Sequence, residues 1–134
     1  MPLAYLDHVN IRTANLGAMR RFYREVLELD DGDRPPFNFG GAWLYCGDRA
    51  AVHLVEVAHQ PAGEEPRIEH FAFRAEGLER FVQRLKAAAV PFTVSIVPST
   101  GNTQINVYDP DGNHIEVQFS AGDGPDLSGL AAPR

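Results

Sequence analysis

The stretch LDHVNIRT at residues 6–13 returns as IEHFAFRA at residues 68–75, with similar residue types at most positions. A second pair of stretches follows the same pattern, since WLYCGDRAAVHLVEV at 43–57 resembles NVYDPDGNHIEVQF at 106–119. The offsets between the two copies are 62 and 63 residues. A repeat of this length indicates two copies of one supersecondary unit that share a core.

The repeat also predicts the domain organisation. Residues 58–67, AHQPAGEEPR, contain two prolines, a glycine and two acids, a composition typical of a linker. We expect a single domain at 1–120, made of module one at 4–57 and module two at 68–120. The remaining residues, 121–134, are rich in glycine, proline and other small residues and are expected to form a flexible C-terminal tail.

Each module is expected to run strand, helix, strand, strand, strand, which makes the fold class α+β. Alternating β-favouring residues indicate strands, and apolar residues three and four positions apart indicate helices. The expected strands lie at 5–13, 42–46, 51–57, 68–75, 91–97, 103–108 and 114–119, and the helices follow the first and fourth of these. One strand of module one is poorly marked, because DDGDRPP at 30–36 is expected to be a loop. DPDG at 109–112 is expected to be a tight turn.

Composition excludes several classes of protein. The chain has 134 residues, of which 44% are hydrophobic, and a formal net charge of -6. This acidity argues against a nucleic-acid partner, which needs a basic surface. Cys46 is the only cysteine, so a disulfide framework is excluded. We expect Cys46 to be buried and to behave as a small hydrophobic residue. We see no signal peptide and no apolar run long enough for a membrane span, so we expect a cytoplasmic protein without a membrane partner.

Four residues of types that bind metals occupy equivalent places in the repeat. His8 and His70 stand in the first strand of each module, and His53 and Glu116 each lie eight residues after a tyrosine, in the last strand. Because side chains alternate along a strand, these residues are expected on the polar faces of their strands. Their equivalence favours one shared cation over four unrelated polar side chains, which would be costly to bury unpaired.

The two other histidines are interpreted differently. His59 falls in the expected linker and is expected at the surface. His114 lies two residues before Glu116 and could share its face. Because it directly follows a turn, we expect fraying there, and His114 is kept as a reserve ligand.

These residues resemble the vicinal oxygen chelate superfamily, which includes glyoxalase I, bleomycin resistance proteins and extradiol dioxygenases. The resemblance covers about 5–119 and is carried by LDHVNIRT, RRFYREVLEL, IEHFAF and DPDGNHIEVQF. The stretch FNFGGAWLYCGDRAAVHLVE is similar to a glyoxalase-like subgroup. The resemblance implies two tandem βαβββ modules that form a partly open, barrel-like cup around a divalent metal.

In the glyoxalase-type pattern, the positions of the metal ligands are held here by His8, His53, His70 and Glu116. Relatives with three ligands would use the same set without His53. Glyoxalase I often has a glutamate at the position of His53. Because this chain has a histidine there, Glu116 is the only carboxylate of the set. Arg12 matches an arginine that binds the glutathione carboxylate in some glyoxalases, whereas Val57 stands where glyoxalases place an asparagine. The pattern for glutathione binding is therefore only partly present.

Three imidazoles and one carboxylate suit one divalent transition metal per site, namely Zn, Ni, Co, Fe or Mn. With four protein ligands, two adjacent oxygens of a substrate can complete a six-coordinate shell, and the metal can stabilise an enediolate. Glu116 is the expected catalytic residue, acting as ligand and proton shuttle. The expected substrate-binding residues are Arg12, Arg74, Phe37 and Trp43. For the arginines the alternative is a salt bridge, and for the aromatic residues it is ordinary packing.

Three functions follow as hypotheses. The first is a glyoxalase-like isomerase, lyase or epimerase that acts on a small molecule. The second is a dioxygenase or an antibiotic or thiol transferase with three protein ligands, which leave room for substrate and O2. The third is a metal-free protein that binds small molecules. A homodimer is expected in each case, because the open edges of a four-stranded sheet need to be covered.

Overall fold

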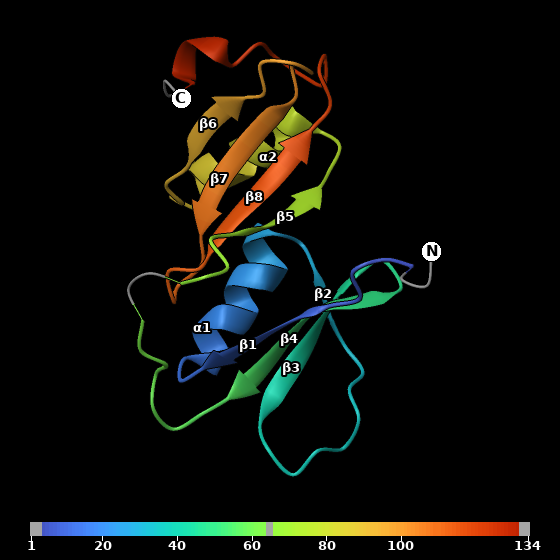
Figure 1. The fold of residues 1–134 in the computed structure, drawn as a ribbon, viewed down its shortest axis with the longest axis vertical. Helices are drawn as coiled ribbons and strands as arrows, with labels where there is room; N and C mark the ends of the chain where they lie inside the picture. The colour runs from blue at the N-terminus through green and yellow to red at the C-terminus, as the bar shows by residue number, and fades with distance from the viewer. Residues whose placement is uncertain (1–3, 64–65, 132–134) are drawn as a thin grey trace. The chain divides into compact units, whose positions relative to one another are not determined.

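The computed structural model describes residues 4–63 and 66–131. The chain divides into two compact units, Met1–Glu64 and Glu65–Arg134, and the division falls in the expected linker. Each unit runs strand, helix, strand, strand, strand (Figure 1). The α+β class and the two repeated βαβββ modules are therefore confirmed, while the joint cup stays a prediction. Within the described ranges, no helix is both long and apolar enough to cross a bilayer.

Module one builds a four-stranded mixed sheet. Its elements are β1 (Val9–Thr13), α1 (Leu16–Arg21), η1 (Phe22–Val26), β2 (Asp30–Gly32), β3 (Gly41–Cys46) and β4 (Arg49–Glu56). The strand order is β1-β4-β3-β2. β1 runs parallel to β4, and the other neighbours are antiparallel. A single turn of π-helix, η1, continues α1 without a break, so the helix covers the expected stretch.

Module two repeats this topology. Its elements are β5 (Phe71–Arg74), α2 (Leu78–Ala87), β6 (Thr93–Ile96), β7 (Thr103–Tyr108), β8 (His114–Phe119) and the short helix η2 (Ser128–Leu130). The order β5-β8-β7-β6 has the same pattern of one parallel and two antiparallel pairs. The positions expected from the repeat therefore have equivalent places in the two sheets.

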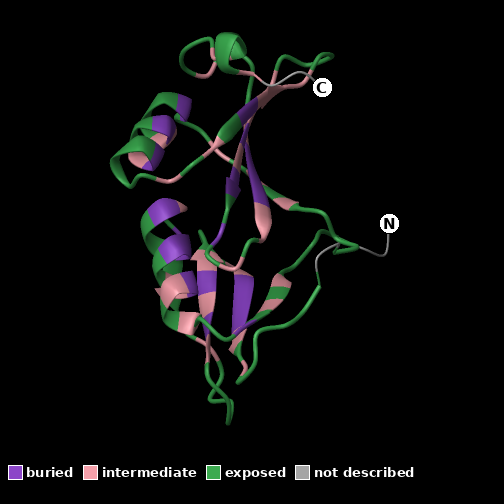
Figure 2. Cartoon of the chain, turned by 90° about the vertical axis from the view of Figure 1, so that its left-hand side faces the viewer, coloured by how far each residue is buried: buried purple, intermediate pink, exposed green. Residues whose placement is uncertain are grey.

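Each helix lies on one face of its own sheet, and the core forms between them (Figure 2). In module one, Met19 and Tyr23 of the helix and Leu44 of β3 are fully buried. In module two, Leu85 of α2 and Ile115 of β8 are fully buried too. Burial of one such apolar side chain stabilises the fold by roughly 1.5–3 kcal/mol. Because side chains alternate, the opposite face of each sheet is left for polar residues.

Two local expectations were wrong. The run 30–36 is not all loop, because Asp30–Gly32 forms β2 at the edge of the sheet and pairs with β3. Asp and Gly have poor strand propensity, so β2 forms because it pairs with β3 and not because of its own residues. Cys46 is exposed rather than buried. Alternation along β3 would direct it to the core, but it lies at the hairpin end of the strand, opposite Arg49.

The C-terminal segment also differs from the expected flexible tail. Within the described residues 121–131, Ala131 forms a β-bridge with Val94. Asp123 accepts hydrogen bonds from the backbone N–H groups of Gly77 and Leu78, at 3.0 and 3.1 Å, at the start of α2. The segment is thus attached to module two through a helix N-terminus that needs acceptors.

Candidate functional site

The last strand of each module places its proposed ligand at the same point of the sheet. His53 of β4 pairs with Trp43 of β3, and Glu116 of β8 pairs with Asn106 of β7. These two pairs are equivalent in the repeat. His53 and Glu116 are both buried, with 8% and 6% of their surface exposed. Each sheet therefore presents one buried proposed ligand from a central strand.

The proposed ligands of the first strands lie just outside those strands. His8 directly precedes β1 and His70 directly precedes β5, although the sequence predicted them inside. Their side chains are 39% and 37% exposed, which is again an equivalent placement. The described ladders with β4 and β8 begin at the next residue, Val9 or Phe71. The two histidines therefore lie just before their strands and are partly exposed, rather than inside the sheet.

The module-one half-site is an open hollow around stacked rings. The ring of His53 lies between those of His8 and Trp43, with centroid distances of 3.9 and 4.0 Å and interplanar angles of 13° and 8°. The hollow is lined by Tyr5, Asp7, His8, Trp43, Tyr45, Asp48, Arg49, Ala50 and His53. Stacked rings restrict the rotation of His53, so its position is defined by packing as well as by the strand.

The surroundings of His53 favour its neutral form. Burial lowers the pKa of the His53 imidazole below its usual value of 6.5, and the neighbouring charge of His8 lowers this pKa further. A neutral imidazole is the form that binds metal ions. However, each ring nitrogen directs its lone pair within the plane of its ring, and the planes of His8 and His53 are nearly parallel. One of the two rings, His8 or His53, therefore has to turn before both can bind one ion.

The module-two half-site brings His70 and Glu116 into direct contact. Nε2 of His70 contacts Oε2 of Glu116. The hollow around them is lined by Glu69, His70, Thr93, Ser95, Gln104, Asn106, Tyr108, His114 and Glu116. The half-site therefore combines imidazole and carboxylate donors with amides and hydroxyls that can orient a substrate.

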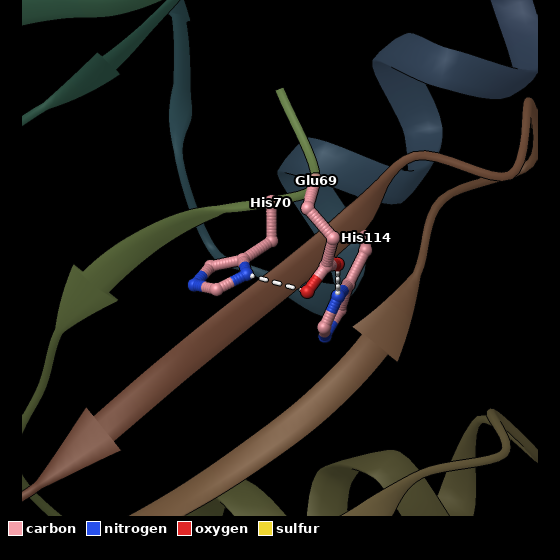
Figure 3. A group of neighbouring side chains, drawn as sticks. All are labelled: Glu69, His70 and His114. Carbon is pink, nitrogen blue, oxygen red and sulfur yellow. Dashed lines mark hydrogen bonds and ion pairs between the residues drawn. The ribbon is translucent and has the colours of Figure 1, made fainter. Parts of the chain in front are cut away.

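Glu69 is the residue that the sequence analysis missed. Its carboxylate lies between two imidazoles (Figure 3), with Oε1 at 3.1 Å from Nδ1 of His70 and Oε2 at 2.5 Å from Nδ1 of His114. Hydrogen bonds from His114 and then His70 lower the pKa of the Glu69 carboxyl. The ligand atoms of these three residues lie within 4.8 Å of one another, so the described residues include a group that could hold a metal ion.

His114 lies within a strand, although the sequence predicted fraying at this residue. It is the first residue of β8, pairs with Tyr108 and is partly buried. Nε2 of His114 lies 2.9 Å from Oδ1 of Asn106, and the ring of Tyr108 stacks on it at a centroid distance of 5.0 Å. The signal that could have found Glu69 is its position, since it precedes His70 as Asp7 precedes His8.

The expected substrate-binding residues lie at different places. Trp43 lines the module-one hollow, and the ring of Phe37 stands 6.4 Å from it, measured between centroids. Arg12 is exposed on β1, outside the lining of that hollow. Arg74 of β5 is exposed and donates a hydrogen bond to Oγ of Ser120 at 3.1 Å. Of the four, Trp43 has the most direct contact with a proposed ligand.

Comparison with known structures finds the same fold in several bacterial proteins. A glyoxylase/bleomycin resistance protein/dioxygenase domain from Frankia sp. EAN1pec is 20% identical, with a TM-score of 0.74, over 91% of this chain and 96% of that one. A lactoylglutathione lyase from Agrobacterium tumefaciens is 22% identical, with a TM-score of 0.65, over 89% and 96%. A glyoxalase family protein from Enterococcus faecalis is 24% identical, with a TM-score of 0.68, over 88% and 99%.

The family assignment comes from the sequence. No curated protein matches the chain. The sequence profile of the family matches residues 5–117, which include all four proposed ligands and nearly the whole repeat. The chain belongs to the Glyoxalase/Bleomycin resistance protein/Dioxygenase superfamily.

Proposed function

We propose that the chain is a metal-dependent enzyme of the glyoxalase type, an isomerase, lyase or epimerase. Its substrate is a small molecule with two adjacent oxygens. The proposed ligands of one divalent transition metal ion are His8, His53, His70 and Glu116. Membership of the superfamily supports the general class, and three imidazoles with one carboxylate suit Zn, Ni, Co, Fe or Mn.

The contact between Nε2 of His70 and Oε2 of Glu116 carries the proposal. Nδ1 of His70 faces Oε1 of Glu69, so the ring lies between two carboxylates. A neutral ring has a single N–H group, so one of its nitrogens presents a lone pair to a carboxylate, and an ionised carboxylate also presents only lone pairs. Such a pair is stable when a cation lies between or beside the two atoms. A metal ion meets this need, as does a second proton on His70.

The chemistry of the site follows from its donors. When bound, the metal would supply a Lewis acid for two adjacent oxygens of the substrate. Glu116 would then accept a proton from the carbon next to a carbonyl and return it to the product, because it is the only carboxylate in the proposed set. Trp43 would shield one side of the His53 ring from water. The proposed contacts to the rest of the substrate come from Arg12, Arg74, Phe37 and Trp43.

Metal analysis tests this proposal. The protein is purified without an affinity tag or chelator, and its metal content is compared with that of His70→Ala, Glu116→Gln and His53→Ala. We expect about one divalent transition metal ion per chain, lost in the first two variants and weakened in the third, because each ligand removed weakens the site. His59→Ala is the matched control, since His59 is exposed in the linker segment.

Activity then separates the possible reactions. A metal-loaded protein that converts dicarbonyl–thiol adducts or epimerises a small hydroxycarbonyl supports the proposal. A wild-type protein that carries no metal and cannot be loaded would overturn it and leave small-molecule binding as the function.

A dioxygenase or a transferase with three ligands is the second candidate, and the stacking of His53 favours it. The parallel rings of His8, His53 and Trp43 do not direct two lone pairs to one point. The ligands would then be His8, His70 and Glu116, and substrate and O2 would have room in the dioxygenase case. Iron content that survives His53→Ala, with substrate-dependent O2 uptake, would favour this dioxygenase over the glyoxalase-type enzyme.

The net charge and the edge strands of the sheets support the proposed partners. A net charge of -6 supports a small-molecule substrate rather than a nucleic acid. We propose a homodimer in the cytoplasm, with no membrane partner, because the edge strands of the sheets need to be covered.

A further inference from the structure

The same arrangement occurs beside the proposed first-strand ligand of each module. Oδ2 of Asp7 lies 2.7 Å from Nδ1 of His8, and Oε1 of Glu69 lies 3.1 Å from Nδ1 of His70. Asp7 and Glu69 each directly precede their histidine and are equivalent in the repeat. Two modules with different neighbours thus direct a carboxylate to the same ring nitrogen.

We propose that Asp7 and Glu69 are positioning residues that hold His8 and His70 in the tautomer with a proton on Nδ1. A neutral imidazole has one N–H group, so an acceptor at Nδ1 leaves the lone pair on Nε2. Nε2 is then ready to bind a cation, and the carboxylate also fixes the direction of the ring. The link to metal binding rests on the function proposed above, whereas the tautomer does not.

Glu69 is held more firmly than Asp7. Its second oxygen accepts a hydrogen bond from Nδ1 of His114 at 2.5 Å, so the carboxylate is fixed between two imidazoles (Figure 3). His114 is in turn fixed by Asn106 and by the stacked ring of Tyr108. The two carboxylates are about equally exposed, at 75% for Asp7 and 71% for Glu69. The contact of Glu69 with a second imidazole, rather than burial, therefore distinguishes it from Asp7.

His114 acts through Glu69 and not as a metal ligand. Its Nδ1 is engaged by Glu69 and its Nε2 by the side-chain amide of Asn106. Both ring nitrogens thus have protein partners outside the proposed ligand set, whereas Nε2 of His70 contacts the proposed ligand Glu116. The group of Glu69, His70 and His114 is therefore a support for one ligand, His70, rather than a separate metal site.

NMR of the metal-free protein tests the tautomers directly. Long-range proton–nitrogen spectra of the histidine rings are recorded at about pH 8, where an ordinary histidine is neutral. We expect His8 as the Nδ1–H tautomer in the wild type. For His70 the spectra are recorded in the Glu116→Ala background, because the Glu116 carboxylate beside Nε2 also accepts a proton there, and in that background we expect the Nδ1–H tautomer. Adding Glu69→Ala removes the acceptor at Nδ1 and moves His70 toward the Nε2–H tautomer, while Glu69→Gln, which keeps a neutral acceptor, gives an intermediate result. Glu76→Gln is the control, because Glu76 is an exposed acid in the bend before α2.

Metal affinity tests the consequence of the tautomer. Zn²⁺ affinity is measured by competition with a chelator, and Co²⁺ absorption reports the ligand set. We expect Glu69→Ala to weaken Zn²⁺ binding by roughly 10–100-fold, the usual effect of losing an outer-shell partner. We expect a smaller loss for Asp7→Ala. His114→Phe keeps a ring against Tyr108, and it should weaken Zn²⁺ binding while leaving the shape of the Co²⁺ spectrum unchanged.

Three outcomes would contradict parts of this inference. Nε2–H tautomers of His8 in the wild type and of His70 in the Glu116→Ala background would overturn the positioning role. A His114→Phe protein that loses Zn²⁺ as completely as His70→Ala would make His114 a ligand. Wild-type protein with the expected tautomers but no Zn²⁺ binding would overturn the proposed metal function and the role of Asp7 and Glu69 in it. Circular dichroism of each variant separates these outcomes from unfolding.

Discussion

The ring of His53 lies between two other rings, and this position controls its charge. It is 8% exposed and stacks on His8 and Trp43. Burial is the larger cause of its lowered pKa, and the charge of His8 is the second. A His53 imidazole that resists protonation remains available to a metal ion, but it also makes the folded state sensitive to acid.

We predict that His53→Phe reduces the acid sensitivity of the fold. Because the pKa of His53 is lowered in the folded state, the unfolded chain binds more protons as the pH falls below about 6.5, and the free energy of unfolding decreases. Phenylalanine retains the stack and cannot titrate. Urea unfolding at about pH 8 and pH 5 should show a smaller decrease for the variant than for the wild type. An unchanged decrease, equal to that of the control His59→Asn, would contradict this prediction.

At the scale of single residues, the repeat in the sequence predicted the equivalent places of His8 and His70, and of His53 and Glu116. It did not predict what each side chain touches. Glu69 and His114 make contact because β8 lies beside β5 in the sheet. This pairing brings together two residues that are 45 positions apart in the sequence. No local pattern in the sequence contains that information.

The turn between β7 and β8 shows how an element can follow directly from its residues. The N–H of Gly112 donates to the carbonyl of Asp109 at 2.9 Å, and Gly112 has a φ of +86° that glycine adopts without strain. The Asp109 side chain accepts further hydrogen bonds from Asn113. The tight turn expected at 109–112 is confirmed, and it sets the start of β8 and hence the position of Glu116.

The start of α2 depends on a residue far away in the sequence. Its N-cap, Gly77, has no side chain to accept a hydrogen bond, and Asp123 supplies the acceptor for two backbone N–H groups. We predict that Asp123→Ala lowers the free energy of unfolding by about 1 kcal/mol, the typical value of a lost helix cap. Urea unfolding measures this change.

Asp126→Ala is the matched control for the helix cap. Asp126 accepts hydrogen bonds from the backbone N–H and the side chain of Ser128, within the same short segment. We expect a change of less than about 0.5 kcal/mol for this surface substitution. Equal losses in both variants would show that the C-terminal segment, and not the cap on α2, accounts for the effect.

At the scale of the whole molecule, each sheet ends in two edge strands. β1 and β2 are the edges in module one, and β5 and β6 are the edges in module two, where Ala131 forms a bridge with Val94 of β6. The repeat-equivalent residues Leu6 and Ile68, which precede β1 and β5, are 78% and 77% exposed. Apolar side chains of this size beside open strand edges favour contact with another chain.

We predict a homodimer that the double substitution Leu6→Asp and Ile68→Asp converts to a monomer. Charges placed at an apolar contact have to be desolvated when the chains associate, which disfavours the dimer. Light scattering with size-exclusion chromatography measures the mass. Leu130→Asp is the control, since Leu130 is also exposed, at 61%, but lies on η2. A wild-type monomer, or a double variant that remains dimeric, would reject this interface.

The sequence by itself determined the repeat, the α+β class, the order of most elements and the equivalent places of the proposed ligands. These follow from residue spacing, because alternation and helical periodicity are local properties of the chain. Only the tertiary structure decided the strand β2, the exposure of Cys46, the attachment of residues 121–131 and the contacts of Glu69. Cys46 is exposed because it lies at the hairpin end of β3. The other three depend on partners elsewhere in the chain, and pairing between separate segments is set by how the sheets assemble rather than by local preference.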